Sequence, residues 1–336
     1  HTYHHLTALS HVFADDHGHP FDGPALVTTN YRNADDGTFD NAYFTNNLAG
    51  DTLLVFGQGV IDFSYDADVV AHEFGHSIIQ TRTQMLFDGL ITYDEFGWNV
   101  APGALHEGLA DYFSASYHGD PVMGEYMAAL GATRYLENDH ACPSHVIGEP
   151  HEDGKLVGGA TWAIREVLGQ ELADAAVYGA LGQMVPTPSF QDFGEALAQV
   201  IDELVEDGEI TAEDADEVHA ILDERGLLLC GRSIDLEPGE PQTVMLPGAQ
   251  LIAEELCELA RNLGAVFSTH YQYAIELPPA AEGPVEQLEL SLEFERVDGA
   301  SLAADDLQFS VYLREDELVT YDFEYLDLIV FELALP

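Results

Sequence analysis

The sequence predicts an α+β protein, with β-structure in its N-terminal part and helices in its next part, followed by an all-β, sandwich-like domain. Residues 1–66 mix aromatic residues with Gly, Asn and Asp, as short strands and loops do. From Asp68 to about Gly226 the apolar residues follow a helical period. After about Arg232 the period changes to two, which is typical of strands with one buried face. A chain of 336 residues has room for two or three such units.

Two segments of the helical part show where helices begin. Ser189 is followed three residues later by Asp192, and the apolar residues after it fall on one helix face. Thr211 is followed in the same way by Asp214, and Gly226 is a typical residue for the end of that helix. We therefore expect one helix from Ser189 and another from Thr211 to about Gly226.

The C-terminal part contains three segments in which apolar and polar residues alternate. They are residues 271–277, 288–294 and 307–313. We expect them to form half-buried antiparallel strands of a β-sandwich, and the Pro and Gly residues at 238–241 to mark the join to the rest of the chain.

The charge of the chain is strongly negative. It has 61 Asp and Glu residues against 10 Lys and Arg residues, and Lys155 is its single lysine. Such a surface repels nucleic acids and anionic lipids, so neither is an expected partner. No run of eighteen apolar residues occurs, so we expect no membrane span. The acidity also suits hydration in concentrated salt, calcium binding, or simply a soluble surface.

The three cysteines are Cys142, Cys230 and Cys257. One disulfide, for example between Cys230 and Cys257, would leave Cys142 free or paired outside this chain, and the spacing does not settle the pairing. No C-x-x-C motif occurs, so a thiolate metal site is not expected.

The helical region contains an H-E-x-x-H motif formed by His72, Glu73 and His76. A spacing of four places both imidazoles on one helix face, with roughly 5–6 Å between their Cβ atoms. Both can then bind one tetrahedral zinc ion. Glu73 points toward the open coordination position, where it can take a proton from water as a general base.

A second segment that is expected to be helical, residues 103–113, places two carboxylates on one helix face, Glu107 and Asp111. We expect Glu107 to be the third metal ligand and Asp111 to accept the outer N–H of a ligating histidine, His72. Two neutral histidines and one carboxylate leave one coordination position open, as catalytic zinc sites do. The sequence therefore predicts one catalytic Zn²⁺ ion.

Together these phrases resemble the thermolysin and fungalysin group of gluzincin metallopeptidases, whose third zinc ligand is a Glu in an E-x-x-x-D phrase. The resemblance covers about residues 1–230 and implies a thermolysin-like fold. On this basis we expect a β-rich N-terminal part with the zinc helix at 1–76, a helical part at 77–231, and a β-sandwich accessory domain at 232–336.

The resemblance also implies roles for further residues. Asn41 and Ala42 lie in a segment similar to the edge strand that hydrogen-bonds the substrate backbone in this family. Tyr93 resembles the tyrosine that helps to stabilise the oxyanion, and His151 resembles the histidine that does the same. Arg134 is similar to the arginine that binds the substrate carbonyl. The family also often carries calcium, so Ca²⁺ is a possible stabilising ion.

The chain departs from the family's pattern around His151, where no aspartate is placed to orient the ring. Glu149 and Asp153 are the two candidates for this task. Trp162 is expected in the core. The remaining nearby histidines are interpreted as ordinary ones: His106, His118, His140 and His145.

These observations predict a secreted zinc endopeptidase, extracellular or in the cell envelope, that acts on protein or peptide substrates. Because the chain starts at His1 with neither an initiator Met nor a signal peptide, we expect a processed product without its propeptide, or a fragment. The alternative is a non-catalytic extracellular binding or adhesion protein with a vestigial zinc site, against which the intact Glu73 argues. A non-haem iron oxygenase would draw its ligands mostly from strands, and an acidic calcium-binding structural protein would need oxygen-ligand loops that the sequence lacks.

Overall fold

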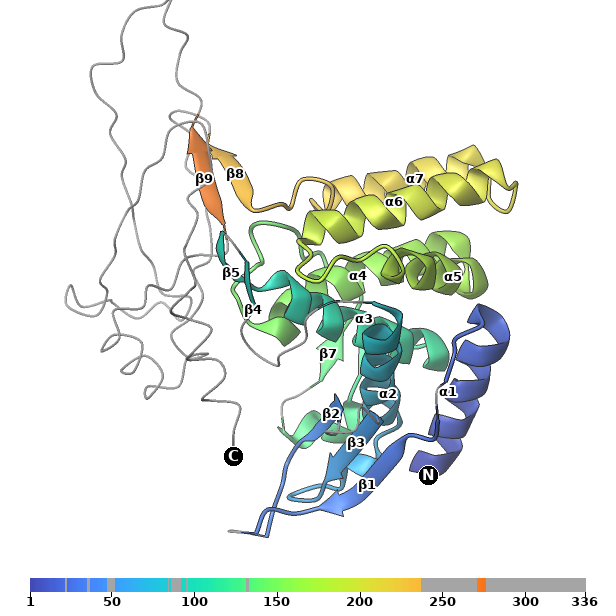
Figure 1. Ribbon diagram of the computed structural model, residues 1–336, viewed down its shortest axis with the longest axis vertical. Coiled ribbons are helices and arrows are strands. Elements are labelled where there is room, and N and C mark those ends of the chain that lie inside the picture. Colours follow the sequence, from blue (N-terminus) through green and yellow to red (C-terminus); the bar gives the residue numbers. More distant parts are fainter. Residues whose placement is uncertain are drawn as a thin grey trace, which may run out of the picture. The chain divides into compact units, whose positions relative to one another are not determined.

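The computed structural model describes residues 1–21, 23–34, 37–46, 52–83, 85, 92–94, 96–130, 133–236 and 271–275. These residues belong to two compact units. The described part of the larger unit lies within His1–Arg232, and the smaller unit holds strands β8 (Ser233–Leu236) and β9 (Gln272–Ile275). Helices and small sheets occur together in the larger unit, so the chain is an α+β protein (Figure 1).

The chain begins with helix α1 (Thr2–His17), so the expectation of only strands and loops in the first part is wrong for these residues. Leu9 and Phe13 are buried four residues apart on one face of this helix. The ring of Phe13 lies 6.2 Å from that of Phe74 and 5.2 Å from that of Phe113. Packing against later helices therefore stabilises a segment whose local sequence signals are weak.

The strands expected in the first part do occur, in a sheet of three. Strands β1 (Leu26–Tyr31), β2 (Ala42–Asn46) and β3 (Thr52–Gly57) lie in the order β1-β3-β2. Strand β1 runs parallel to β3, and β2 runs antiparallel to it. Strand β2 is thus an outer strand of this sheet, with Ala42 opposite Phe56.

Three helices carry most of the candidate site residues. They are α2 (Ala67–Arg82), α3 (Ala101–His118) and α4 (Pro150–Leu168), and α3 packs against both of the others (Figure 1). Glycines allow close approach: a Cβ atom at Gly108 would lie 2.3 Å from the carbonyl oxygen of Gly154. Since no side chain fits there, α3 and α4 can cross at short distance.

The helices expected from Ser189 and Thr211 are confirmed. They are α6 (Phe190–Glu206) and α7 (Ala212–Glu224), and each begins with a capping box, formed by Ser189 with Asp192 and by Thr211 with Asp214. Trp162 is buried, as expected. The other elements of this unit are helix α5 (Gln170–Leu181), strands β4 (Thr92–Asp94), β5 (Gly97–Asn99), β6 (Val122–Met123) and β7 (Arg134–Tyr135), and 3-10 helices η1 (Phe63–Tyr65) and η2 (Glu125–Leu130).

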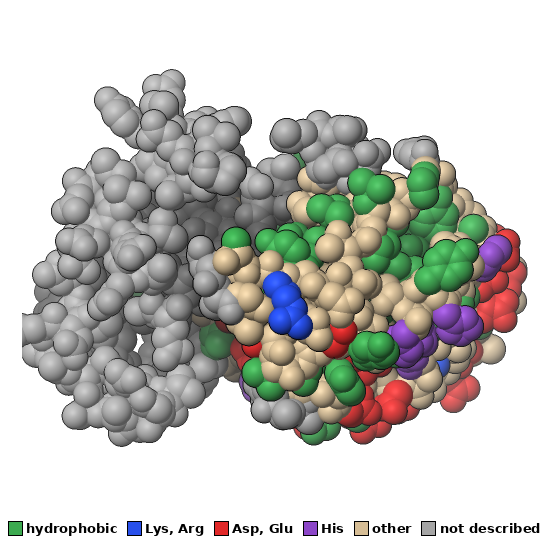
Figure 2. Space-filling model, turned by 90° about the horizontal axis from the view of Figure 1, so that it is seen from below, with side chains coloured by type: hydrophobic (Ala, Val, Ile, Leu, Met, Phe, Trp, Pro, Cys, Tyr) green, Lys and Arg blue, Asp and Glu red, His purple; other side chains and the backbone are tan. Residues whose placement is uncertain are grey.

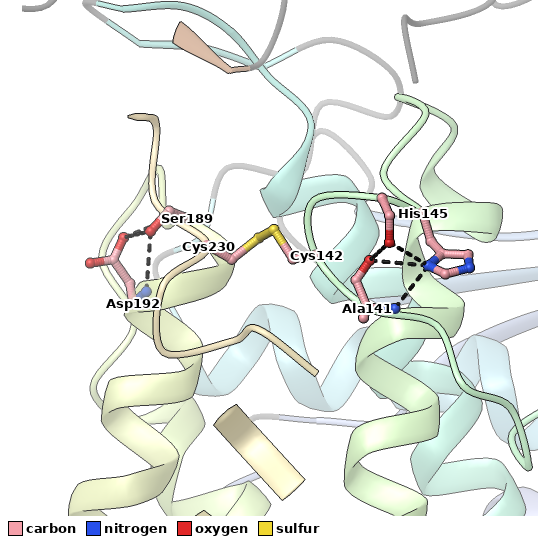
Figure 3. Close-up of a disulfide and its surroundings, with 7 residues drawn as sticks. Ala141, Cys142, His145, Ser189, Asp192 and Cys230 are labelled. Atoms are coloured by element: carbon pink, nitrogen blue, oxygen red, sulfur yellow. Dashed lines mark hydrogen bonds between the residues drawn. A yellow bond between two sulfur atoms is a disulfide. The ribbon is translucent and has the colours of Figure 1, made fainter. Parts of the chain in front are cut away.

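A disulfide joins Cys142 to Cys230, so the candidate pairing of Cys230 with Cys257 is wrong. The two cysteines are 88 residues apart in sequence. Figure 3 shows the bond between the segment that leads into α4 and the segment that follows α7, beside the capping box of α6. Tertiary packing brings these segments together, which spacing alone could not show. Cys257 lies outside the described residues.

In the smaller unit, β8 and β9 pair in parallel, with Ile234 opposite Tyr273. The expectation of antiparallel pairing is therefore wrong for the segment at 271–275. The alternating segments at 288–294 and 307–313, and the join at 238–241, lie outside the described residues. Among the described helices none is both long and apolar enough to cross a membrane.

The surface of the larger unit is consistent with the acidic composition. On the face drawn in Figure 2, acidic side chains gather along one edge close to several His side chains, while Lys and Arg side chains are sparse.

Candidate metal centre

Three buried side chains from two helices converge on one point. His72 and His76 come from α2 and Glu107 from α3, and each offers one ligand atom within 4.8 Å of the others. Nε2 of His72 lies 3.1 Å from Oε2 of Glu107, and Nε2 of His76 lies 3.6 Å from its Oε1. The sequence motif therefore produces a compact, water-shielded group of two imidazoles and one carboxylate.

The helix geometry explains this convergence. His72 and His76 are one turn apart on α2, and their ring centroids are 4.6 Å apart. Gly75, between them in the motif, lets α3 come close, because a Cβ atom there would lie 3.1 Å from Cα of Ala110. The close crossing places Glu107 opposite both imidazoles.

Asp111 lies one turn after Glu107 and contacts the outer nitrogen of His72. Nδ1 of His72 is 2.7 Å from Oδ1 of Asp111. Burial opposes a charged ring, but Asp111 and Glu107 raise the pKa of His72 to about 10. The structure thus brings Asp111 to the position expected for a residue that orients a metal-binding histidine.

Arg134, on β7, donates two hydrogen bonds to the same carboxylate. Its Nε lies 2.7 Å from Oδ2 of Asp111, and its Nη2 lies 2.5 Å from Oδ1. Burial would raise the pKa of Asp111, yet Arg134 and His72 hold it below its usual range. The family resemblance implied a substrate-binding role for Arg134, and in the structure its guanidinium donates to Asp111.

Glu73 is buried beside the cluster, with 6% of its surface exposed. Burial raises the pKa of its carboxyl, while His72 and His76 act in the opposite direction. Glu107 behaves differently: burial would raise its pKa, but His76 and a hydrogen bond from His72 hold it well below its usual range. The pKa values of two neighbouring carboxyl groups are therefore shifted in opposite directions, upward for Glu73 and downward for Glu107.

His151, in the first turn of α4, points its Nε2 to within 3.4 Å of Oε2 of Glu107. Its Nδ1 lies 2.9 Å from Oε1 of Glu149. Of the two candidates to orient this ring, Glu149 makes the contact, and Asp153 instead accepts hydrogen bonds from the backbone at 147 and 148. Burial opposes the charged form of His151, and Glu149 and Glu107 raise its pKa above the usual value.

Sequence reasoning missed one residue of the site. His106 was interpreted as an ordinary histidine, but its Nδ1 lies 3.2 Å from Nδ1 of His76, and the residue is fully buried. Burial, followed by the nearby His76, holds the pKa of His106 well below its usual value. Its position directly before Glu107 was the available signal.

The other residues with predicted roles, Asn41, Ala42 and Tyr93, lie in or next to strands β2 and β4. Asn41 is exposed and precedes β2, and Ala42 is the first residue of that outer strand. Two residues further along β2, Phe44 stacks on His76 with ring centroids 6.3 Å apart. Tyr93 lies on β4 opposite Trp98 of β5, and the orientation of its side chain is outside the described structure.

No protein-family model matches the chain, and no curated protein matches it either. A donor set of two imidazole nitrogens and one carboxylate oxygen, buried and within reach of one ion, suits a metal ion such as zinc.

Proposed function

We propose that the chain is a zinc-dependent endopeptidase with a thermolysin-like, gluzincin site. The observation that carries this proposal is the buried group of His72, His76 and Glu107, with Glu73 buried beside it. The group supplies three protein ligands, so a tetrahedral ion held there would have one further coordination position, the pattern of catalytic zinc sites. An acidic protein of this kind fits peptide substrates better than nucleic acids.

Zinc is favoured over iron by the way the ligands are held. The two histidines lie one turn apart on a helix, with an acidic residue next to the first. A bound zinc ion supplies Lewis acidity that polarises a peptide carbonyl and makes water a stronger acid. Proton transfer, stabilisation of the oxyanion and alignment of the substrate would be carried out by side chains and backbone of the protein itself.

Glu73 acts in the proposal as the general base. Its raised pKa brings the carboxyl closer to neutral pH, which suits a group that must first accept and then release a proton. It accepts a proton from the attacking water and delivers it to the nitrogen of the departing amine, so the base is restored after each cycle.

His151 and Tyr93 are the proposed hydrogen-bond donors to the oxygen that becomes negative during attack. The contact of His151 with Glu149 supports this role, because it keeps the ring protonated to higher pH and aims its Nε2 toward Glu107. Asn41 and Ala42 are proposed to align an extended peptide along the outer strand β2, as β-strand addition does elsewhere.

The disulfide between Cys142 and Cys230 supports a secreted or cell-envelope location for the enzyme, since such bonds persist in oxidising compartments. Calcium as an additional stabilising ion remains part of the proposal on the family resemblance alone.

Metal removal tests the proposal. Purified protein should contain one zinc per chain and hydrolyse casein, lose hydrolysis on dialysis against a chelator, and regain it when zinc is added back. His72→Ala should contain no zinc and be inactive. His11→Ala changes a histidine of α1 whose side chain is 72% exposed, so it should match the wild type. Folded wild-type protein without zinc, or hydrolysis that survives chelation, would rule the proposal out.

A further inference from the structure

The two ligand histidines have different partners at their outer nitrogens. Nδ1 of His72 meets the carboxylate of Asp111 at 2.7 Å. Nδ1 of His76 meets Nδ1 of His106 at 3.2 Å, in a pair of residues that are 4% and 0% exposed. One ligand is therefore backed by a carboxylate that Arg134 also holds, and the other by a second imidazole ring.

The two Nδ1 atoms of His76 and His106 can be joined by one proton, which one ring donates and the other accepts. Two imidazole nitrogens 3.2 Å apart can form a hydrogen bond when one carries a proton and the other a lone pair. His76 turns its Nε2 toward Glu107, so a metal bound there leaves the proton on Nδ1. His106 must then present the lone pair of its own Nδ1 and carry its proton on Nε2.

The contact is a hydrogen bond in geometry and not a ring stack. The ring centroids of His76 and His106 are 5.4 Å apart and the planes are tilted by 36°. His106 also sits on α3 directly before Glu107, so the same turn of helix carries one ligand and the outer partner of another. A shift of that turn would move both together.

We propose that His106 is a positioning residue for the metal, which accepts the Nδ1 proton of His76 and fixes the tautomer and orientation of that ligand. This inference rests on the proposed metal site and deepens it. A neutral acceptor holds His76 without adding a negative charge. The site thus combines one histidine that contacts a carboxylate with one that contacts an imidazole, and a metal ion bound there would be more electron-poor than one with two carboxylate partners.

Two variants of nearly equal size separate hydrogen bonding from packing. In His106→Asn the amide oxygen can still accept a proton from His76, whereas in His106→Leu no acceptor remains. Zinc affinity, measured by competition with a chelator at one pH, should fall by about 10- to 100-fold in His106→Leu. It should fall much less in His106→Asn, and the unfolding temperatures of the two metal-free variants should be similar.

A spectroscopic measurement on the wild type avoids the risk that a variant fails to fold. In zinc-loaded protein labelled with ¹⁵N-histidine, His106 should show a protonated Nε2 and an unprotonated Nδ1, and Nδ1 of His76 should carry a proton. A protonated Nδ1 on His106, or equal losses of zinc affinity in the Asn and Leu variants, would overturn the inference.

The outcomes also separate this inference from the proposed function. If the folded wild type binds no zinc, the proposed function fails and the inference falls with it. If the wild type binds zinc and His106→Leu binds it equally well, the inference alone is wrong.

Discussion

His151 and Glu149 form a contact of 2.9 Å between Nδ1 and Oε1 at the start of α4. Glu149 also caps this helix, since its Oε2 accepts a hydrogen bond of 2.7 Å from the backbone N–H of Glu152. One side chain thus sets both the beginning of α4 and the orientation of the ring that reaches Glu107.

Replacing Glu149 with Gln should make the pH dependence of hydrolysis shift. Burial opposes the charged form of His151, and Glu149 raises its pKa, so the ring stays protonated to higher pH in the wild type. Without that carboxylate the pKa falls, and the donor form of His151 is lost at lower pH. The alkaline limb of kcat/KM should therefore move to lower pH in Glu149→Gln. Glu152→Gln removes a neighbouring carboxylate that contacts Lys155 and should leave the profile unchanged. An unmoved limb in Glu149→Gln would refute this role.

Asp111→Asn should weaken zinc binding. Asn keeps the size of the side chain but cannot provide two anionic oxygens to His72 and Arg134. We expect a loss of about 10- to 100-fold in zinc affinity, measured by chelator competition. Asp174→Asn is the control, because this carboxylate accepts its hydrogen bonds from Tyr112 and Ser116 of α3 and not from His72 or Arg134. It should lower stability and leave zinc affinity within a few fold. Equal zinc affinities in Asp111→Asn and the wild type would contradict the account.

The buried carboxyl of Asp153 should make stability depend on pH. It accepts hydrogen bonds from the N–H groups of Ile147 at 2.7 Å and Gly148 at 2.8 Å, and burial raises its pKa to about 7. The folded protein therefore keeps this proton up to about pH 7, whereas the unfolded chain releases it near pH 4. Its contribution to the free energy of unfolding must fall as pH rises through that window, by at most about 1.4 kcal/mol per pH unit.

Asp153→Asn should remove this component. Urea unfolding between pH 4 and 7 should give a shallower loss of stability with rising pH in the variant than in the wild type. Asp216→Asn, at an exposed position on α7, should follow the wild-type slope. A steeper slope in Asp153→Asn would show that the sign is wrong.

Gly108→Ala should disturb the crossing of α3 and α4. The added Cβ would lie 2.3 Å from the Gly154 carbonyl oxygen and 2.8 Å from Cβ of Val157, so the helices must move apart. Overpacking of this kind costs about 1–3 kcal/mol, and we expect a lower unfolding temperature together with weaker hydrolysis, since His151 would move relative to Glu107. Gly23→Ala meets nothing within 4 Å and should be neutral. A fully stable, fully active Gly108→Ala would show that the crossing tolerates more space than the structure indicates.

Local sequence signals predicted those parts of the site that lie within single helices. The spacing of His72 and His76 fixes their common face, and the same rule holds for Glu107 and Asp111. The helix starts at Ser189 and Thr211 were also readable, because a capping box is contained in four residues.

Contacts between segments that are distant in the sequence could not be predicted from helix periodicity or capping boxes. The pairing of Cys142 with Cys230, the contact of Arg134 with Asp111 and the parallel pairing of β8 with β9 all depend on how separate elements pack. Helix α1 was missed for a related reason, since its two buried apolar residues, Leu9 and Phe13, are stabilised by packing against later helices that the local sequence does not reveal. His106 was overlooked because the sequence shows its place directly before Glu107, whereas its contact with His76 depends on how α2 and α3 pack.

The most direct test of the central claim is to measure zinc content and casein hydrolysis together for the wild type and Glu73→Gln. Gln keeps the shape of the buried side chain but cannot accept the proton, and Glu73 is not among the three ligands. We predict one zinc per chain in both proteins and a loss of hydrolysis of at least about 100-fold in the variant. Hydrolysis that persists in zinc-loaded Glu73→Gln, or folded wild-type protein that binds no zinc, would contradict the account.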